Sequence, residues 1–130
     1  MPESSRTRRS SATSSPRARW RRKLGRGLPR GLGPLPGEAV VTHGRVNAFY
    51  ASDLEQVLAG IGAERLILAG VATNSVVEHS ARHAADMGYA VALAADACSA
   101  GQPHLHQAAL DNIALLGEVS TVAALLEQDA

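Results

Sequence analysis

Hydrophobic and polar positions follow two different periods over the C-terminal two-thirds of the chain. Two short apolar runs, residues 65–69 and 89–95, have the length and unbroken hydrophobicity of fully covered strands in a parallel sheet. Between them, apolar residues recur at helical spacing over residues 74–87, and Gly88 supplies a helix C-cap. The pattern therefore predicts a strand, a helix and a second strand in succession.

Two further elements are predicted before this unit. Residues 38–42 are predicted to form a first strand. Ser52 with Glu55 three residues later is a capping box, which predicts the start of a helix. The apolar face of that helix has a spacing of three and four residues: Leu54, Val57, Leu58 and Ile61.

Helices and strands continue to alternate toward the C-terminus. Residues 103–116 are predicted to form a helix with proline in its first turn, residues 118–120 a short strand, and residues 121–128 a last helix. This alternation predicts an α/β fold, a doubly wound parallel sheet with helices on both faces. Ligands bind outside the carboxyl ends of the strands in such sheets, so the loop at residues 70–75 is the predicted site.

Charge divides the chain into two unlike segments. Residues 1–30 contain ten Lys or Arg and one acid, whereas residues 31–130 contain three Lys or Arg and eleven acids. Because residues 1–32 are rich in Arg, Ser, Pro and Gly, we expect a disordered basic segment there and a folded domain over residues 33–130. A basic arm carrying Trp20 could bind nucleic acid, but a solvated tail is the favoured interpretation. A wrong reading frame or start in GC-rich DNA is a third explanation.

Composition limits the remaining possibilities. The chain has one cysteine, Cys98, which excludes an internal disulfide framework. It has no apolar stretch typical of a secretory signal or of a membrane span. We therefore expect a cytoplasmic protein with no membrane partner, and nothing in the sequence calls for a cofactor.

The sequence GVATNSVV at residues 70–77 resembles the nucleophile loop of the isochorismatase-like (cysteine hydrolase) superfamily, which is usually G-V-A-T-x-x-C-V. The segments Asn47-Ala48-Phe49 and Asp96-Ala97 are similar to other parts of that family's pattern. The resemblance covers residues 31–128, about the C-terminal two-thirds of a usual family domain. It implies the isochorismatase-like, Rossmann-like three-layer fold in an N-terminally truncated form.

The resemblance also implies which positions carry the chemistry. Family members use a Cys nucleophile, a Lys that stabilises charge, and an Asp that acts as base and acid. Here the Cys position is Val76, the Lys position is His43, and no apolar strand ending in Asp lies upstream. The backbone N–H groups of Ala72 and Val76 would form the oxyanion hole. Many members also have a cis peptide bond before the equivalent of Ala72, which sequence alone does not decide here.

The resemblance implies a hydrolase domain that by descent acts on small amides or related metabolites. The departures at the catalytic positions predict that this domain is impaired or inactive in this chain. Some family members that lack the Cys cleave a vinyl ether with the Asp as acid, so Val76 alone does not exclude catalysis. Ser75 and Cys98 are weak candidates for a substitute nucleophile. The residues expected to line the cleft are Phe49, Val71, Thr73, Asn74 and Ser75.

Other residues and partners have alternative interpretations. His79 and His83 have the spacing of a zinc-binding pair on one helix face, but without a third ligand we expect a solvated pair and no metal site. The alternatives to a hydrolase are a non-catalytic ligand-binding or oligomerisation module and, less favoured, a nucleic-acid-associated protein. A small-molecule ligand is expected both for a hydrolase and for a ligand-binding module. Because the family's first strand is not visible, we expect an exposed strand edge and a homo-oligomer.

Overall fold

The computed structural model describes residues 31–129, and within them the chain divides between Glu38 and Ala39. On the short side of this division Gly37 has a φ of +90°, a conformation that favours glycine, and makes a turn. The N–H of Glu38 donates to the carbonyl of Leu35 at 3.0 Å, and its carboxylate accepts from the N–H of Leu35 at 2.8 Å. The predicted disorder of residues 1–32 falls almost entirely outside the described residues.

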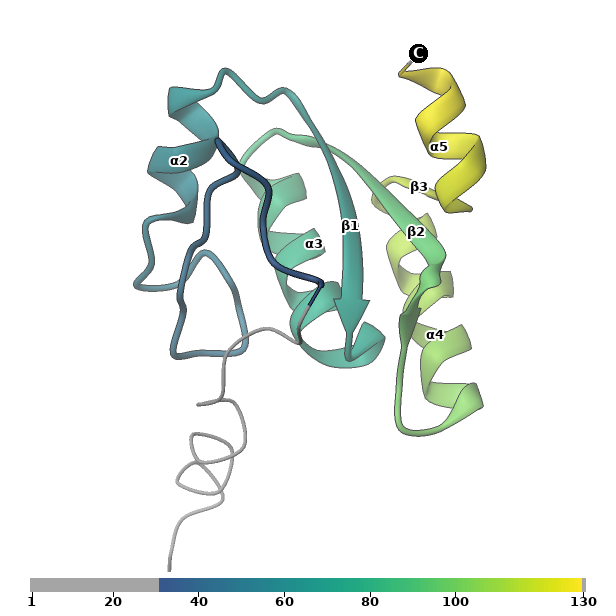
Figure 1. Ribbon diagram of the computed structural model, residues 1–130. Coiled ribbons are helices and arrows are strands. Elements are labelled where there is room, and N and C mark those ends of the chain that lie inside the picture. Colours follow the sequence, from purple (N-terminus) through teal and green to yellow (C-terminus); the bar gives the residue numbers. More distant parts are fainter. Residues whose placement is uncertain (1–30, 130) are drawn as a thin grey trace, which may run out of the picture. The chain divides into compact units, whose positions relative to one another are not determined.

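The longer unit alternates helices and parallel strands, as the sequence predicts (Figure 1). The first strand of the central unit is followed by a single π-helical turn that leads into a regular helix. The bounds are α2 Leu54–Gly60, β1 Arg65–Val71, η1 Thr73–Val77, α3 Glu78–Asp86, β2 Ala90–Ser99, α4 Pro103–Ala114, β3 Glu118–Ser120 and α5 Val122–Gln128.

Three parallel strands form the described sheet, in the order β1-β2-β3. Leu68 pairs with Leu93, but two residues later Gly70 pairs with Cys98, so the register shifts by three residues at this point. The shift lies at the carboxyl end of β1, immediately before the turn η1. The prediction of an α/β fold with a parallel sheet is confirmed.

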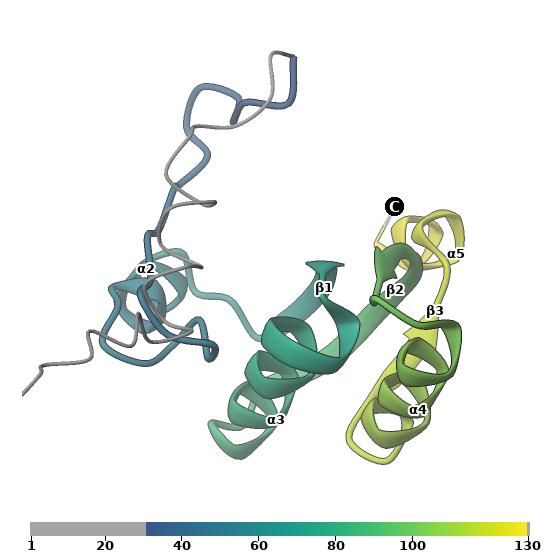
Figure 2. The same cartoon turned by 90° about the horizontal axis from the view of Figure 1, so that it is seen from below.

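Helices cover both faces of β2: α3 and α4 lie on one face and α5 on the other (Figure 2). Leu93 belongs to the larger core cluster, which includes Ile113 of α4. Ala92 belongs to a second cluster with Leu125 of α5. The two clusters use alternate residues of β2, which is the period of a strand covered on both faces.

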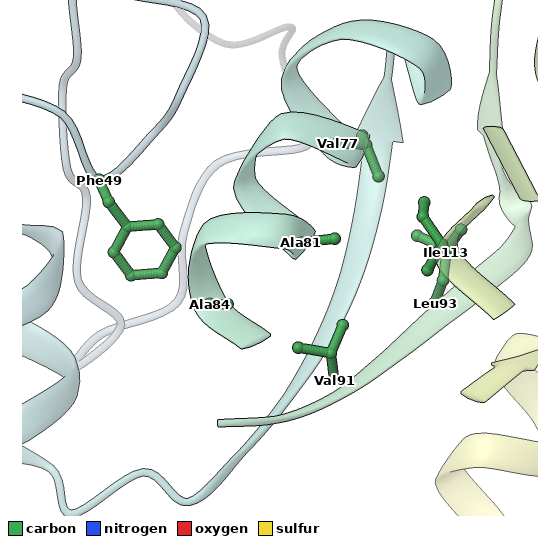
Figure 3. Packing of buried hydrophobic residues seen from close by; sticks show 7 residues of the cluster. All are labelled: Phe49, Val77, Ala81, Ala84, Val91, Leu93 and Ile113. Atoms are coloured by element: carbon green, nitrogen blue, oxygen red, sulfur yellow. The ribbon is translucent and has the colours of Figure 1, made fainter. Parts of the chain in front are cut away.

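The larger core cluster extends to both sides of α3. Figure 3 shows Val77, Leu93 and Ile113 together on one side of this helix and the ring of Phe49 on the other. The sheet side contains small residues of α3, among them Ala81, which is fully buried. These small side chains allow the helix to lie close to the strands.

Two strand predictions need correction. Residues 38–42 form no strand, and the side chain of Val40 is 67% exposed. A strand requires hydrogen bonds to a neighbouring strand, and no strand among residues 31–129 pairs with this segment. β1 is not fully covered either, because Ile67 is 39% exposed and Val71 is 71% exposed. An apolar pattern does not predict whether a strand has a pairing partner or whether another element covers its face, which explains both corrections.

The starts of two helices also differ from the prediction. Ser52 does not form a capping box: its Oγ accepts from the N–H of Leu54 at 3.3 Å, and α2 begins at that residue with Asp53 as N-cap. The helix predicted from residue 74 begins as η1 and becomes regular only at Glu78. Gly88, with a φ of +94°, follows α3 in the position predicted for its C-cap. Within residues 31–129, no helix is both long and apolar enough to cross a membrane.

Candidate functional site

The loop after β1 turns sharply at Ala72. The peptide bond between Val71 and Ala72 is cis, which answers the question that the sequence left open. The carbonyl of Ala72 accepts from the N–H of Ser75 at 3.1 Å and from the N–H of Val77 at 3.3 Å. The loop is thus a compact turn at the carboxyl end of β1, where the fold predicts a ligand site.

A buried threonine holds this loop against α4. The side chain of Thr73 is fully buried, and its Oγ1 lies 2.8 Å from Nδ1 of His106. This hydrogen bond reaches the next helix and does not join Thr73 to another residue of the loop. His106, four positions into α4, therefore helps to fix the loop in place.

Val76 occupies the position at which the family resemblance places a nucleophile. Its side chain is half-buried and packs against the larger core cluster. An isopropyl group has neither a lone pair to attack a carbonyl nor a proton to transfer. The hydroxyl of the preceding residue, Ser75, is exposed. The assignment of the Ala72 and Val76 N–H groups as an oxyanion hole stays a prediction.

His43, at the position of the family lysine, lies on an exposed irregular segment. Its Nδ1–H donates to the backbone carbonyl of Arg45 at 2.6 Å. This bond is local, between residues two apart, and ties the imidazole to its own segment. An imidazole is shorter than a lysine side chain and does not carry its permanent charge.

A groove of about 510 Å³ runs beside α3 and reaches the loop. Val46 and Asn47 line one side, and Asn74, Ser75 and polar side chains of α3 line the rest. Of the five residues predicted to line a cleft, Asn74 and Ser75 do so.

The other three predicted cleft residues lie elsewhere. Phe49 and Thr73 are buried in the core, and Val71 is exposed but does not line the groove. The type of these three residues and their closeness to the loop in the sequence do not predict the direction of their side chains.

Polar contacts attach one side of the groove to α3. The N–H of Ala48 donates to Oγ of the buried Ser80 at 3.0 Å. The side chain of Asn47 lies 2.9 Å from Nδ1 of His83, and the ring of Phe49 stacks on the His83 ring with centroids 5.0 Å apart. His83 is therefore half-buried and held in place, which corrects the expected solvated histidine pair; His79 is exposed.

The acidic residues of the groove have different surroundings. Glu78 accepts from Nδ2 of Asn112 at 2.9 Å and pairs with Arg82 at 3.5 Å. Asp86, at the end of α3, is exposed. Among residues 31–129, no three His, Cys, Asp or Glu side chains come together in a group that could hold a metal ion.

Cys98 lies opposite Gly70 in the sheet register, close to the loop. Burial raises the pKa of the Cys98 thiol, the backbone N–H of Gly70 opposes this, and the Asp96 carboxylate raises it further. A raised pKa keeps the thiol protonated and reduces its nucleophilicity. The raised pKa therefore works against a nucleophilic role for Cys98.

Comparison with known sequences identifies relatives over most of the chain. The isochorismatase domain model matches residues 7–124. The uncharacterized isochorismatase family protein YecD of Escherichia coli O157:H7 is 34% identical over 85 residues, which are 65% of this chain and 45% of YecD. The ureidoacrylate amidohydrolase RutB of Methylobacterium radiotolerans is 40% identical over 95 residues, which are 72% of this chain and 37% of RutB. The chain thus spans less than half the length of these relatives.

Solved structures show the same similarity. An isochorismatase-like hydrolase from Alkaliphilus metalliredigens aligns with a TM-score of 0.76 and 25% identity over 80% of this chain and 58% of that chain. The nicotinamidase SaPncA from Staphylococcus aureus aligns with a TM-score of 0.57 and 25% identity over 59% of this chain and 49% of that chain. Since the family model matches far more than half of its residues, this chain belongs to the isochorismatase family.

Proposed function

We propose that this chain carries a hydrolase-family domain that binds a small amide or related metabolite and hydrolyses it slowly or not at all. Relatives named as a ureidoacrylate amidohydrolase and as a nicotinamidase support the ligand class. The groove beside α3 supports ligand binding, because its volume of about 510 Å³ lies in the range typical of small-molecule sites.

The proposal of weak or absent turnover depends chiefly on Val76. The loop that resembles the family's nucleophile loop follows β1, but the side chain at the nucleophile position is an isopropyl group packed against the core. The lysine position supports the same conclusion, because His43 stands there.

Ammonia release tests the proposal directly. The full chain is incubated with nicotinamide and with ureidoacrylate, and the RutB relative is assayed in parallel as a positive control for ureidoacrylate. We expect ammonia from the RutB reaction and at most a much slower release from this chain. Turnover by this chain at a rate comparable to that of RutB would overturn the proposal.

The Val76→Cys variant separates the loss of the nucleophile from the change at the lysine position. We expect this variant to gain a second thiol but no hydrolysis, because the imidazole of His43 does not supply the permanent charge of a lysine at that position. Alkylation with iodoacetamide, compared with the wild type, verifies that the new thiol is accessible. Hydrolysis restored by this single change would show that the remaining machinery is present after all.

A non-catalytic ligand-binding module is the second candidate, supported by the same groove. Thermal unfolding of the wild-type chain with and without nicotinamide distinguishes the two candidates. A higher Tm in the presence of the amide, with no ammonia released, favours the binding module. A slow but measurable release of ammonia favours an impaired hydrolase.

A further inference from the structure

The orientation of the Asn47 side chain in the groove is determined by its neighbours. Its Oδ1 accepts from the N–H of Phe49 at 2.9 Å, which places the amide nitrogen toward His83. Nδ2–H therefore donates to Nδ1 of His83 at 2.9 Å. Asn47 is itself buried, so this amide has little freedom to turn over.

The orientation of Asn47 fixes the tautomer of His83. A ring nitrogen that accepts a hydrogen bond carries no proton, so the neutral imidazole has its proton on Nε2. The Phe49 ring, nearly parallel to the imidazole at 11°, holds the plane of the ring. The one polar atom that His83 can offer to a ligand in the groove is thus a hydrogen-bond donor, Nε2–H.

The groove offers an acceptor on the same helix face. Asp86 lies three residues after His83, a spacing that brings side chains together on a helix, and both residues line the groove. Glu78 and Arg82, which also line it, pair with each other at 3.5 Å. Apart from the histidines, the lining carries two carboxylates and one guanidinium, which disfavours an anionic ligand.

We propose that this groove recognises the neutral carboxamide or ureido group of the ligand, with His83 Nε2–H donating to its carbonyl oxygen and Asp86 accepting from its N–H. A ligand with a carboxylate in place of the carboxamide has no N–H to donate to Asp86. Its negative charge would also lie beside the negative charge of Asp86. Discrimination between amide and acid therefore depends on Asp86. The inference rests on the proposed function only for the class of ligand.

Nicotinamide and nicotinic acid are a matched pair of probes, because the first carries a carboxamide and the second a carboxylate on the same ring. Titration of the ¹⁵N-labelled full chain near pH 8, followed by amide chemical shifts, gives both affinities and the location of binding. We expect nicotinamide to shift signals of residues 79–86 and nicotinic acid to bind about five- to tenfold more weakly. Equal affinities, no binding of nicotinamide at millimolar concentration, or shifts confined to other elements would overturn the proposal.

Two variants assign the roles of the side chains. Asp86→Asn should bring the two affinities to within about a factor of two of each other, because it removes the like-charge contact. Asp111→Asn on α4 is the matched control: the same exposed charge is removed outside the groove, where Asp111 bonds to Gln107, and the preference should remain. An unchanged preference in Asp86→Asn would refute the role of Asp86.

His83→Phe keeps a ring against Phe49 and removes the donor. We expect it to weaken nicotinamide binding, while circular dichroism and Tm report whether the variant still folds. If it does not fold, His83→Leu provides the same test, because leucine also lacks a hydrogen-bond donor. These readouts are independent of turnover, so a failure here leaves the ammonia and Val76→Cys results to judge the proposed function separately.

Discussion

The two longest strands of the sheet have similar sequences and different surroundings. β2 pairs with a strand on each side and has helices against both faces. β1 pairs with β2 alone among the described strands, and alternate residues such as Ile67 are exposed on one face. An unbroken apolar run is therefore not sufficient evidence of full burial. What covers a strand is determined by elements distant in the sequence.

The largest expected difference between the strands comes from truncating one large side chain in each. Leu93 of β2 is 0% exposed, and Leu93→Ala should lower the free energy of unfolding by about 2–5 kcal/mol through lost burial and an internal cavity. Ile67→Ala in β1 should cost less than about 1 kcal/mol, because that side chain already contacts solvent. Urea unfolding followed by circular dichroism measures both values.

This pair also provides a test of the comparison itself. If Leu93→Ala leaves no folded protein, the expectation for β2 is met and Ile67→Ala remains measurable. Equal losses in the two variants would mean that β1 is covered in solution, and the difference between the strands would then be wrong.

Substitution of Gly117, which precedes β3 and lies against Val91 of β2, should give the next largest effect. A Cβ added to Gly117 would lie 2.1 Å from the carbonyl oxygen of Val91, and backbone cannot move aside cheaply. Gly117→Ala should therefore cost about 1–3 kcal/mol. Gly60→Ala at the end of α2 is the control: its Cβ would meet nothing within 4 Å, so stability should be unchanged or slightly higher. A neutral Gly117→Ala would contradict the close approach to β2.

The sequence predicted most elements of the fold because their signals are local. Helical spacing, the C-cap at Gly88 and the proline at the first turn of α4 each depend on neighbouring residues, and those elements lie where expected. The strand predicted at residues 38–42 did not form, since strand formation depends on a partner. The register shift between Leu68 and Gly70 likewise has no signal in either strand alone.

The candidate site was predicted in part for the same reason. The family loop and its place after β1 follow from residues 70–77, and Asn74 and Ser75 do line the groove. The contact between Asn47 and His83 joins residues 36 apart, so no local pattern could indicate it. An Asn-Ala-Phe segment before a helix, together with a histidine on α3, is the weak signal that could have suggested a docking contact.

The exposed face of β1 leads to a prediction about self-association. We propose that copies of this chain associate through this face, as the expectation of a homo-oligomer requires. Light scattering over a range of concentrations should show an average mass above that of the monomer for the wild type and a lower mass for Ile67→Lys. Leu115→Lys is the control, because Leu115 is 84% exposed at the end of α4 and is not part of β1.

The oligomer prediction has two results that would refute it. A wild type that is monomeric at every concentration would remove the proposal. Equal loss of association in Ile67→Lys and Leu115→Lys would show that added charge, and not the β1 face, is responsible.

The smallest expected effect concerns Cys98, which pairs with Gly70 four residues beyond the buried run of β2 at residues 91–94. Burial is the main cause of the raised pKa of its thiol, so the folded protein holds that proton more tightly than the unfolded chain does. The stability from this thiol is thus present below the unfolded pKa and is lost as pH rises above it. The urea midpoint of the wild type should therefore fall more than that of Cys98→Ala between about pH 8 and about pH 10. If the urea midpoints of the wild type and of Cys98→Ala fall equally with pH, the Cys98 thiol is as exposed to water as the exposed face of β1. The difference in burial between β1 and β2 would then not extend to residue 98.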